Sequence, residues 1–334
     1  MKLNNLQILR GISALLVCCF HFRADINFQN LKIGEILFGN GSIGVPIFFV
    51  ISGFIMAYTN KINGVENKEI LSDILLFYKR RVIRIIPLYY ILTFAWIVLG
   101  ASLLLYFTDA SLRSRLFHSL LFLPHQNHPP VLYLGWSLNY EMFFYAVFGL
   151  SLFFKKKKYI FITLFFLTSY SVGKLLISDN PFFKMLTSNL NLYFVMGIFL
   201  AIIFRKITIA RDVAVSVSVI GILLFSALFF NFIIIKQELL ILLVVTAFVL
   251  SFLLFDFALK IKASKILVFF GDISYSLYLS HPFTDIVLRR FSIAESYRIP
   301  FFIFKIILSV ALAALLYHFI EKKITAYMKT KLNA

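Results

Sequence analysis

Two ionisable residues, Arg10 and His21, interrupt the first apolar stretch of the chain, LQILRGISALLVCCFHF at residues 6–22. Successive residues of a helix turn by about 100° and rise by about 1.5 Å, so both side chains lie on one helix face, about 16 Å apart. Ionisable groups inside a membrane segment usually face a protein interior or a water-filled path that serves function. The alternative is that the arginine and the histidine simply reach the two membrane surfaces from the ends of the helix.

A carboxylate lies in another apolar stretch, LGWSLNYEMFFY at residues 134–145. Glu141 has no basic residue within one helical turn, so it must be protonated or paired with a group from another helix. Ser137, Glu141 and Tyr145 recur at intervals of four residues and form one polar stripe. Because packing does not require a buried acid, this stripe indicates a function.

An arginine pair stands at the start of a further apolar stretch, in YKRRVIRIIPLYY at residues 78–90. Arg81 and Arg84 are one turn apart and share a face, and Arg80 adjoins them. Guanidinium groups bind phosphate oxygens through paired hydrogen bonds, which lysines do less well. The alternative is that these arginines anchor the helix at the cytoplasmic surface.

Two more motifs place small or polar groups in apolar surroundings. In FFVISGFIM at residues 48–56, Ser52 precedes a glycine, and such small residues permit close packing of helices. GDISYSLYLSHPF at residues 271–283 carries three polar side chains on one helix face: Ser274, Tyr278 and His281. For the second motif, an aromatic belt at the membrane surface is the alternative. Together the motifs indicate a buried reaction chamber or a translocation path.

The elements that carry these residues are predicted to be membrane helices. Hydrophobic residues make up 61% of the 334 residues and charged residues 14%, whereas soluble domains are closer to half apolar and a quarter charged. The net charge of +18 comes from short basic runs between apolar stretches, such as Lys155–Lys158. Such runs are typical of cytoplasmic loops and argue against nucleic-acid binding. We therefore predict an all-α, polytopic membrane protein.

About ten transmembrane helices are expected, since each needs about 20 apolar residues. They are residues 5–25, 41–58, 84–107, 131–154, 159–177, 188–204, 213–235, 238–258, 266–284 and 299–320. The stretch Leu116–Leu123 is too short to span a membrane. Basic residues favour one set of loops by about two to one, which predicts that both termini face the cytoplasm. We expect a single transmembrane domain over residues 1–334, with no appended soluble domain and no metal site.

Five motifs occur in a characteristic order along the chain. They are Arg10 followed by His21 after ten intervening residues, SGF at 52–54, Arg81-x-x-Arg84, WSLNYE at 136–141 and SYSLYLSHP at 274–282. With these motifs, essentially the whole chain resembles the acyltransferase family 3 membrane proteins, which O-acylate bacterial carbohydrates. Within that family, LQILRGISALLV, GVPIFFVISGFIM and PVLYLGWSLNYEMFFY are most similar to the exopolysaccharide (succinoglycan-type) O-acetyltransferases. Pro46 departs from the family, whose members commonly have an acidic residue there.

The resemblance implies transfer of an acetyl group from cytosolic acetyl-CoA to a hydroxyl of a bacterial surface polysaccharide or its lipid-linked precursor. It places the enzyme in the bacterial inner membrane, with acetyl-CoA as co-substrate and no cofactor. His21 would be the catalytic base, oriented by Glu141, and Arg10 would contact the donor or order the chamber. The residues expected to bind the phosphates of CoA are Arg80, Arg81 and Arg84. Candidates for the chamber or the acceptor site are Ser52, Trp136, Ser137, Asn139, Tyr145, Ser274, Tyr278 and His281.

Several alternatives stay open at this point. Direct transfer and a relay through an acyl-histidine both fit the sequence. A transporter of a lipid-linked sugar would use the same polar path, although the chain lacks the internal repeat that many transporters have. A non-catalytic subunit of a polysaccharide export complex would tolerate the loss of His21.

Overall fold

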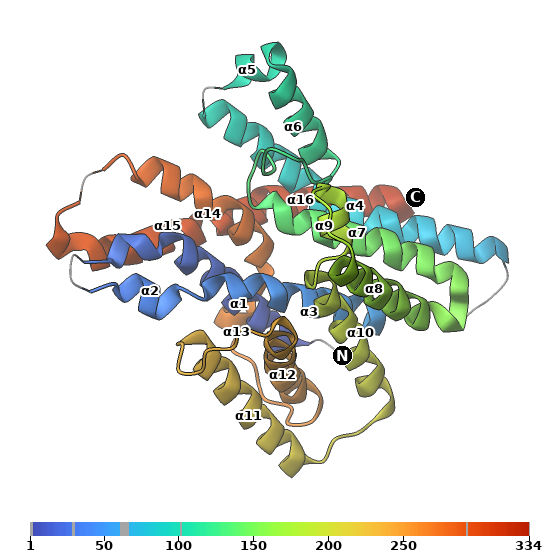
Figure 1. The fold of residues 1–334 in the computed structure, drawn as a ribbon. Helices are drawn as coiled ribbons and strands as arrows, with labels where there is room; N and C mark the ends of the chain where they lie inside the picture. The colour runs from blue at the N-terminus through green and yellow to red at the C-terminus, as the bar shows by residue number, and fades with distance from the viewer. Residues whose placement is uncertain (1–2, 29–30, 61–66, 101, 292, 334) are drawn as a thin grey trace. The chain divides into compact units, whose positions relative to one another are not determined.

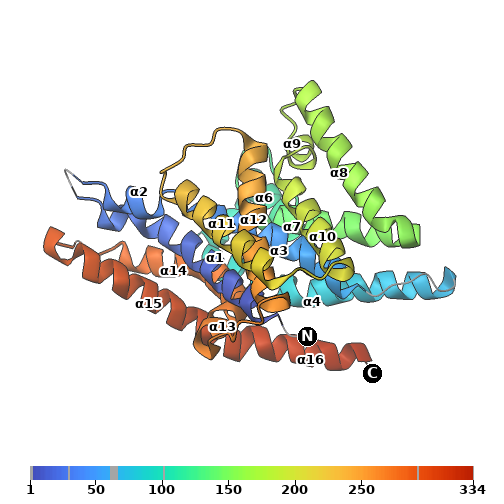
Figure 2. The same cartoon turned by 90° about the horizontal axis from the view of Figure 1, so that it is seen from below.

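The computed structural model describes residues 3–28, 31–60, 67–100, 102–291 and 293–333, and every regular element in these ranges is a helix (Figures 1 and 2). The all-α prediction is confirmed. Within these ranges, eight helical segments are long and apolar enough to cross a membrane. They are Asn4–Ile26, Ile33–Thr59, Ile70–Leu99, Gly135–Leu175, Pro181–Lys206, Arg211–Phe229, Glu238–Phe257 and Glu295–Thr330.

The structure divides or joins the expected spans in three places. The expected span 84–107 covers the end of α4 (Asn67–Leu99) and a separate helix, α5 (Leu103–Thr108). The expected span 266–284 forms two shorter helices, α13 (Lys265–Asp272) and α14 (Ser274–Leu288), which are separated at Ile273. The expected spans 131–154 and 159–177 form one nearly continuous helical stretch that bends at Lys155, where φ is 49°. The number of ten crossings and the cytoplasmic placement of both termini therefore stay predictions.

The first of two compact units comprises residues 1–58 and 196–317. Its α-helices are α1 (Asn4–Phe22), α2 (Ile33–Phe38), α3 (Gly44–Thr59), the later part of α10 (Leu190–Lys206), α11 (Arg211–Phe229), α12 (Glu238–Phe257), α13, α14 and α15 (Arg298–Leu316). Short 3-10 helices occur at η1 (Arg23–Ile26), η2 (Gly41–Ile43) and η4 (Glu295–Tyr297). Helix α1 packs against α12, α13 and α14, and α14 runs beside α15 (Figures 1 and 2).

The N-terminus of α1 is held by a carboxylate from α12. Asp256 is 8% exposed, and its two oxygens accept hydrogen bonds from the backbone nitrogens of Asn5 at 3.0 Å and Leu6 at 2.9 Å. A negative side chain suits this end of a helix because its N–H groups have no intrahelical acceptor. Farther along α1, a Cβ at Gly11 would lie 2.8 Å from the backbone nitrogen of Gly271, so α1 and α13 pack closely.

The second unit comprises residues 59–195 and 318–334. Its α-helices are α4 (Asn67–Leu99), α5 (Leu103–Thr108), α6 (Ala110–Leu120), α7 (Gly135–Ser151), α8 (Lys158–Leu175), α9 (Pro181–Leu186), the start of α10 and α16 (Lys322–Asn333). Two shorter elements complete it, the 3-10 helix η3 (Leu152–Lys157) and the π-helical turn η5 (Tyr317–Glu321), which begins at the unit boundary. Helix α4 packs against both α7 and α16.

Contacts between α4 and α7 fix the helix that carries Glu141. Tyr78 Oη on α4 donates a hydrogen bond to Ala146 O on α7 at 2.9 Å. A Cβ at Gly149 would lie only 2.3 Å from the Tyr78 ring, so the glycine makes room for this contact. Phe77 stacks on Phe148 with ring centroids 5.3 Å apart.

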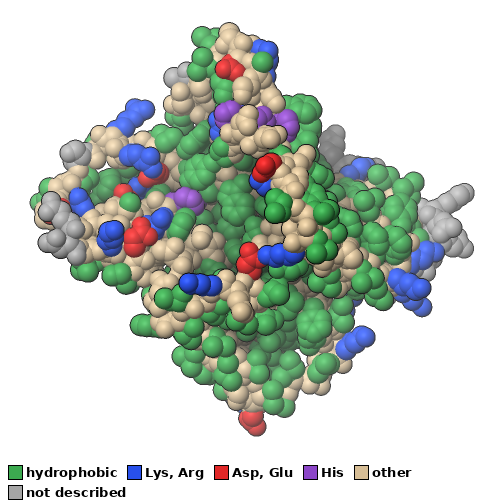
Figure 3. Space-filling model, in the orientation of Figure 1, with side chains coloured by type: hydrophobic (Ala, Val, Ile, Leu, Met, Phe, Trp, Pro, Cys, Tyr) green, Lys and Arg blue, Asp and Glu red, His purple; other side chains and the backbone are tan. Residues whose placement is uncertain are grey.

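Hydrophobic side chains are exposed along many of the helices and cover much of the face shown in Figure 3. Leu104, Phe107 and Leu175 are 79%, 69% and 80% exposed. Apolar groups of this size are normally buried when a protein is surrounded by water, whereas hydrocarbon chains solvate them well. The exposed apolar surface and the long apolar helices together identify a multi-pass membrane protein.

Candidate active site

The predicted site residues are divided between the two units. The first unit contains Arg10, His21, Ser52, Ser274, Tyr278 and His281. The second unit contains Arg80, Arg81, Arg84, Trp136, Ser137, Asn139, Glu141 and Tyr145. The predicted orientation of His21 by Glu141 joins residues of different units and stays a prediction.

His21 on α1 and His281 on α14 form a pair in the first unit. His21 Nδ1 lies 3.3 Å from His281 Nε2, and the ring centroids are 5.0 Å apart. The same nitrogen of His21 lies 2.8 Å from Val17 O, one turn earlier on α1. His281 Nδ1 lies 3.1 Å from Leu277 O, one turn earlier on α14. The histidine expected to be the base therefore contacts one expected only to line the chamber.

Aromatic rings enclose this histidine pair. His281 is fully buried, and its ring centroid lies 5.9 Å from that of Phe22 and 6.4 Å from that of Tyr278. Thr284 Oγ1 donates a hydrogen bond to His281 O at 2.6 Å, which holds the backbone of α14 at this point. The position and orientation of the His281 ring are thus set by packing and hydrogen bonds together.

A buried ion cluster lies one helical turn beyond the two histidines. Lys305 on α15 is 2% exposed, and its Nζ lies 2.5 Å from both Asp25 Oδ2 and Asp285 Oδ1. The ammonium also stands 4.4 Å from the ring centroid of Phe22, and Arg289 pairs with the other oxygen of Asp285. This cluster was not predicted from the sequence, although a single lysine within an expected span was the available signal.

Arg10 lies near the contact between α1 and α13, and Ser274 begins α14 directly after α13. Arg10 Nη1 donates to Gln7 Oε1 at 3.0 Å, and Gln7 Nε2 donates to Asp272 Oδ1 at 2.8 Å. Ser274 Oγ donates to Gly271 O at 2.7 Å, where α13 ends. These contacts show a role in packing for both residues, and their roles in the reaction chamber stay predictions.

The small residues of α3 face another helix. A Cβ at Gly197 on α10 would lie 2.1 Å from Val50 O and 2.6 Å from Phe54 N. The backbones of α3 and α10 therefore approach closely at the SGF motif, as the packing interpretation of that motif predicts. Ser52 itself is half-buried, and its predicted place in the chamber stays a prediction.

Glu141 forms a hydrogen-bonded pair with Tyr145 in the second unit. Tyr145 Oη donates to Glu141 Oε1 at 2.5 Å, one turn apart on α7, as their four-residue spacing indicates. The Arg81 guanidinium on α4 lies 5.7 Å from the ring centroid of Tyr145 and 5.7 Å from that of Phe77. The Tyr145 end of the predicted polar stripe thus lies beside an arginine of α4.

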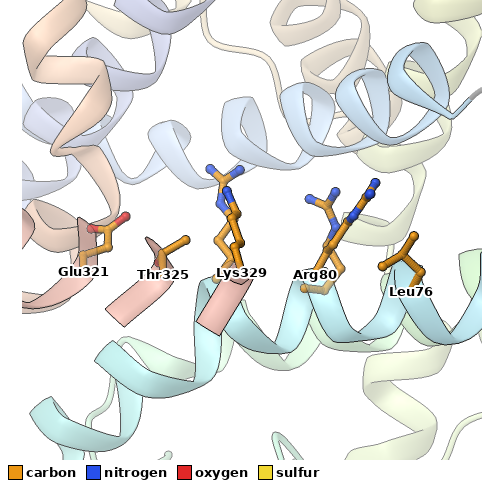
Figure 4. A pocket seen from close by; sticks show the side chains of 7 residues that line it. Leu76, Arg80, Glu321, Thr325 and Lys329 are labelled. Atoms are coloured by element: carbon orange, nitrogen blue, oxygen red, sulfur yellow. The ribbon is translucent and has the colours of Figure 1, made fainter. Parts of the chain in front are cut away.

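The three arginines predicted to bind CoA line one cavity in the second unit. The cavity has a volume of about 520 Å³ and lies between α4 and the C-terminal residues, with Leu76, Arg80, Arg81, Arg84, Glu321, Thr325 and Lys329 as lining residues. Figure 4 shows the side chains of Thr325 and Lys329 rising from α16 toward the same space as Arg80 from α4. Among the described residues, no acceptor contacts the buried Nε of Arg81.

The C-terminal wall of this cavity was not predicted from the sequence. Glu321, Thr325 and Lys329 recur at intervals of four residues, so the signal for a shared helix face was present in the sequence. What the spacing cannot show is which helix that face meets. Four basic side chains and one carboxylate give the cavity the character of an anion-binding site.

The remaining candidates on α7 differ in their surroundings. Trp136 is 37% exposed and contacts the Tyr140 ring edge-on, with centroids 6.0 Å apart. Ser137 Oγ donates to Leu134 O at 3.2 Å at the start of the helix. Asn139 is 4% exposed, and within the described residues its Oδ1 meets no hydrogen-bond donor. Their predicted place in the chamber or acceptor site stays a prediction.

A histidine cluster that sequence analysis also missed lies at the end of α6 and in the segment after it. Ring centroids of His118 and His125 are 4.8 Å apart, and those of His125 and His128 are 5.3 Å apart. In Figure 3 histidine side chains gather next to the α5–α6 region. Partial burial lowers the pKa of His125, and the charges of His118, His128 and Arg115 lower it further.

Comparison with known proteins decides the family. The model of the family described as "Acyltransferase domain", acyltransferase family 3, matches residues 3–318 and so spans both units. The chain belongs to acyltransferase family 3. Its members include enzymes that transfer acyl groups, so this acyltransferase is an enzyme rather than a transporter or a non-catalytic subunit.

Two relatives are similar to this acyltransferase over most of its length. The exopolysaccharide production protein ExoZ of Rhizobium meliloti (strain 1021) is 29% identical over 279 residues, covering 80% of this chain and 84% of ExoZ. The O-acetyltransferase OatA of Staphylococcus aureus (strain NCTC 8325) is 26% identical over 358 aligned residues, covering 96% of this chain. That alignment spans only 57% of the length of OatA. No solved structure matches the acyltransferase.

Proposed function

We propose that this acyltransferase moves an acetyl group from cytosolic acetyl-CoA to a hydroxyl of a bacterial surface polysaccharide, or its lipid-linked precursor, in the inner membrane. The family supports acyl transfer, and the names of ExoZ and OatA support a polysaccharide acceptor and an O-acetyl product. The observation that carries the choice of donor is the basic cavity of about 520 Å³ in the second unit.

The chemistry of that cavity suits a coenzyme A ester. CoA carries a diphosphate and a further phosphate on its nucleotide end, so it needs several cations in one place. Arg80, Arg81, Arg84 and Lys329 supply four, and guanidinium groups bind phosphate oxygens in pairs. The buried Nε–H of Arg81 supplies an additional donor, and burying a donor without an acceptor is costly unless a ligand provides one.

His21 would act as the general base. Its unprotonated nitrogen takes the proton from the acceptor hydroxyl while that oxygen attacks the thioester carbonyl carbon. The carbon–sulfur bond then breaks, and the histidine returns the proton to the departing sulfur, so the products are the O-acetyl ester and CoA. General base catalysis by a positioned histidine typically contributes about 10²–10⁴-fold to the rate.

The test compares variants in the native strain after deletion of the gene. Wild type, His21→Ala, Arg81→Gln/Arg84→Gln and His318→Ala are restored at equal membrane abundance, with the exposed His318 as control. Proton NMR of the purified surface polysaccharide, before and after mild alkali, reports base-labile acetyl groups. We expect an acetyl signal with wild type and His318→Ala only. A full signal with His21→Ala would contradict the role of His21.

The donor is tested separately in isolated membranes. The assay measures transfer of label from acetyl-CoA to polysaccharide. In the arginine double variant, a higher acetyl-CoA concentration should restore this transfer, because the substitutions lower the affinity for the donor and leave His21 intact. If the double variant has a wild-type KM for acetyl-CoA, the cavity does not bind the donor.

A further inference from the structure

We propose that His281 is the positioning residue of the catalytic base: together with Val17 O it accepts a hydrogen bond from His21 Nδ1–H, and so it helps to keep the lone pair of His21 on Nε2. This inference rests on the proposed function, since it concerns how His21 works as a base. It assigns to a neighbouring imidazole the orienting part that a carboxylate has in hydrolase triads.

The position of the hydrogen on His21 follows from its contact with the backbone. A carbonyl oxygen can only accept a hydrogen bond, and Val17 O lies 2.8 Å from His21 Nδ1. In the neutral ring Nδ1 must therefore carry the hydrogen. The lone pair is then on Nε2, and this is the nitrogen that can take a proton from a hydroxyl.

The hydrogen on His281 is placed by its own backbone contact in the same way. Its Nδ1 lies 3.1 Å from Leu277 O, so Nδ1 carries the hydrogen and Nε2 carries the lone pair. That lone pair lies 3.3 Å from His21 Nδ1. In the other tautomer two N–H groups would meet, and the Leu277 carbonyl would face a nitrogen without hydrogen. One direction of donation, from His21 to His281 and on to Leu277, satisfies these three contacts.

This arrangement serves the protonated state of the base as well as the neutral one. When His21 Nε2 takes a proton, Nδ1–H becomes a donor with a positive charge, and hydrogen bonds from charged donors are about twice as strong. Val17 O and His281 Nε2 both accept the hydrogen bond from this charged Nδ1–H, and neither acceptor has to move. Because His281 is fully buried, its lone pair is shielded from bulk solvent.

The nearby carboxylates are already engaged. Asp25 follows His21 by four residues, and Asp285 follows His281 by four. Both are held by Lys305 at 2.5 Å, and Asp285 is also paired with Arg289. Their charge is thus compensated by two cations, and the observed acceptor of His21 Nδ1–H on α14 is an imidazole.

The test uses two replacements of nearly equal size. In His281→Gln the side-chain oxygen can accept from His21 Nδ1–H, whereas in His281→Met of similar volume no such acceptor remains. The full chain is purified in detergent, and kcat and KM are measured with acetyl-CoA and a deacetylated polysaccharide acceptor. We expect the Met variant to lose about 10²-fold in kcat with KM for acetyl-CoA within about twofold, and the Gln variant to recover at least about tenfold.

Equal activity of the Gln and Met variants would overturn the proposal, because packing alone would then explain any loss. His21→Ala serves a different purpose: if it keeps full activity, the proposed function fails whatever the His281 variants do. If neither His281 variant folds, a measurement on the wild-type chain can still overturn the proposal. With ¹⁵N-labelled histidine and His21→Gln for assignment, NMR should show neutral His21 with hydrogen on Nδ1, and hydrogen on Nε2 would overturn the proposal.

Discussion

Lys305 Nζ lies 2.5 Å from Asp285 Oδ1, and the two residues belong to the neighbouring helices α15 and α14. The same ammonium lies 2.5 Å from Asp25 Oδ2 in η1. With 2% of the lysine side chain exposed, one buried cation therefore joins three elements around the histidine pair. Removing this buried cation leaves Asp25 without it and Asp285 with the exposed Arg289 alone, and breaking a buried ion pair in this way costs more than the net worth of the pair.

We expect Lys305→Met to lower the free energy of unfolding by about 3–5 kcal/mol, because two carboxylates lose their shared cation. Adding Asp25→Asn and Asp285→Asn to this variant should recover part of the loss. Thermal unfolding in detergent measures both effects. Lys184→Met is the matched control, since it breaks the exposed pair with Asp179 and should cost less than about 1 kcal/mol. A triple variant no more stable than Lys305→Met would contradict the charge-based explanation.

Lys329 provides a second test, on affinity for the donor. Lys329→Gln should weaken binding of CoA by about 5- to 10-fold, because one cation of the cavity is lost. Glu321→Gln should act in the opposite direction and tighten binding, since it removes the carboxylate of the same cavity. Isothermal titration of the purified chain with CoA measures both dissociation constants.

The control for Lys329 lies on the same helix. Lys322 on α16 is exposed and is not among the cavity-lining residues, so Lys322→Gln should leave the dissociation constant within about twofold. Raising the salt concentration should shrink the difference between Lys329→Gln and wild type, because exposed charges are screened. If Lys322→Gln and Lys329→Gln weaken CoA equally, general surface charge rather than the cavity attracts the ligand.

Helical periodicity accounts for what could be predicted of the site. Glu141 and Tyr145 meet because four residues make about one turn, and Arg81 and Arg84 line one cavity because they share a helix face. These predictions depended only on the spacing of residues that are close together in the sequence. The order of the motifs likewise identified the family, because it can be read from the sequence without knowing how the helices pack.

What could not be predicted depends on contacts between distant segments. Lys305 meets Asp25 across 280 positions, and nothing local in either segment indicates the partner. The break at Ile273 was also missed, since the apolar pattern continues through 266–284 although the helix ends there. The pairing of His21 with His281 is of the same kind, with 260 positions between them.

The histidine cluster after α6 predicts a dependence of local stability on pH. The pKa of His125 is lowered in the folded chain, first by burial and then by the charges of His118, His128 and Arg115. In the unfolded segment His125 has an ordinary pKa of about 6.5. As the pH falls below that value, the unfolded segment therefore binds more protons than the folded one. Acidification from about pH 7.5 to about 5.5 should therefore lower the local stability.

Hydrogen exchange measures this effect as protection factors for residues 110–131, corrected for the intrinsic rate at each pH. Wild type should lose protection on acidification, and His125→Gln should lose less. His318→Gln is the control, because that histidine lies outside the cluster. Protection that is unchanged or higher at the lower pH would contradict the sign derived from His125.

Close packing of α10 against α3 gives the last prediction. Gly197→Ala would place a Cβ 2.1 Å from Val50 O and 2.6 Å from Phe54 N, both backbone atoms that cannot rotate away. The two helices must separate, and the expected loss in the free energy of unfolding is about 1–3 kcal/mol. Gly100→Ala is the matched control, since the nearest atoms would lie at 3.4 Å, an ordinary contact distance.

The same separation would displace contacts farther along α10. Arg205 Nη2 donates to Ala57 O at 2.7 Å, and Phe204 contacts Phe54 with ring centroids 6.4 Å apart. Thermal unfolding in detergent of both glycine variants therefore tests whether SGF serves helix packing. Equal melting temperatures for Gly197→Ala and Gly100→Ala would show that α3 and α10 can separate without loss of stability. The small residues of the motif would then need another explanation.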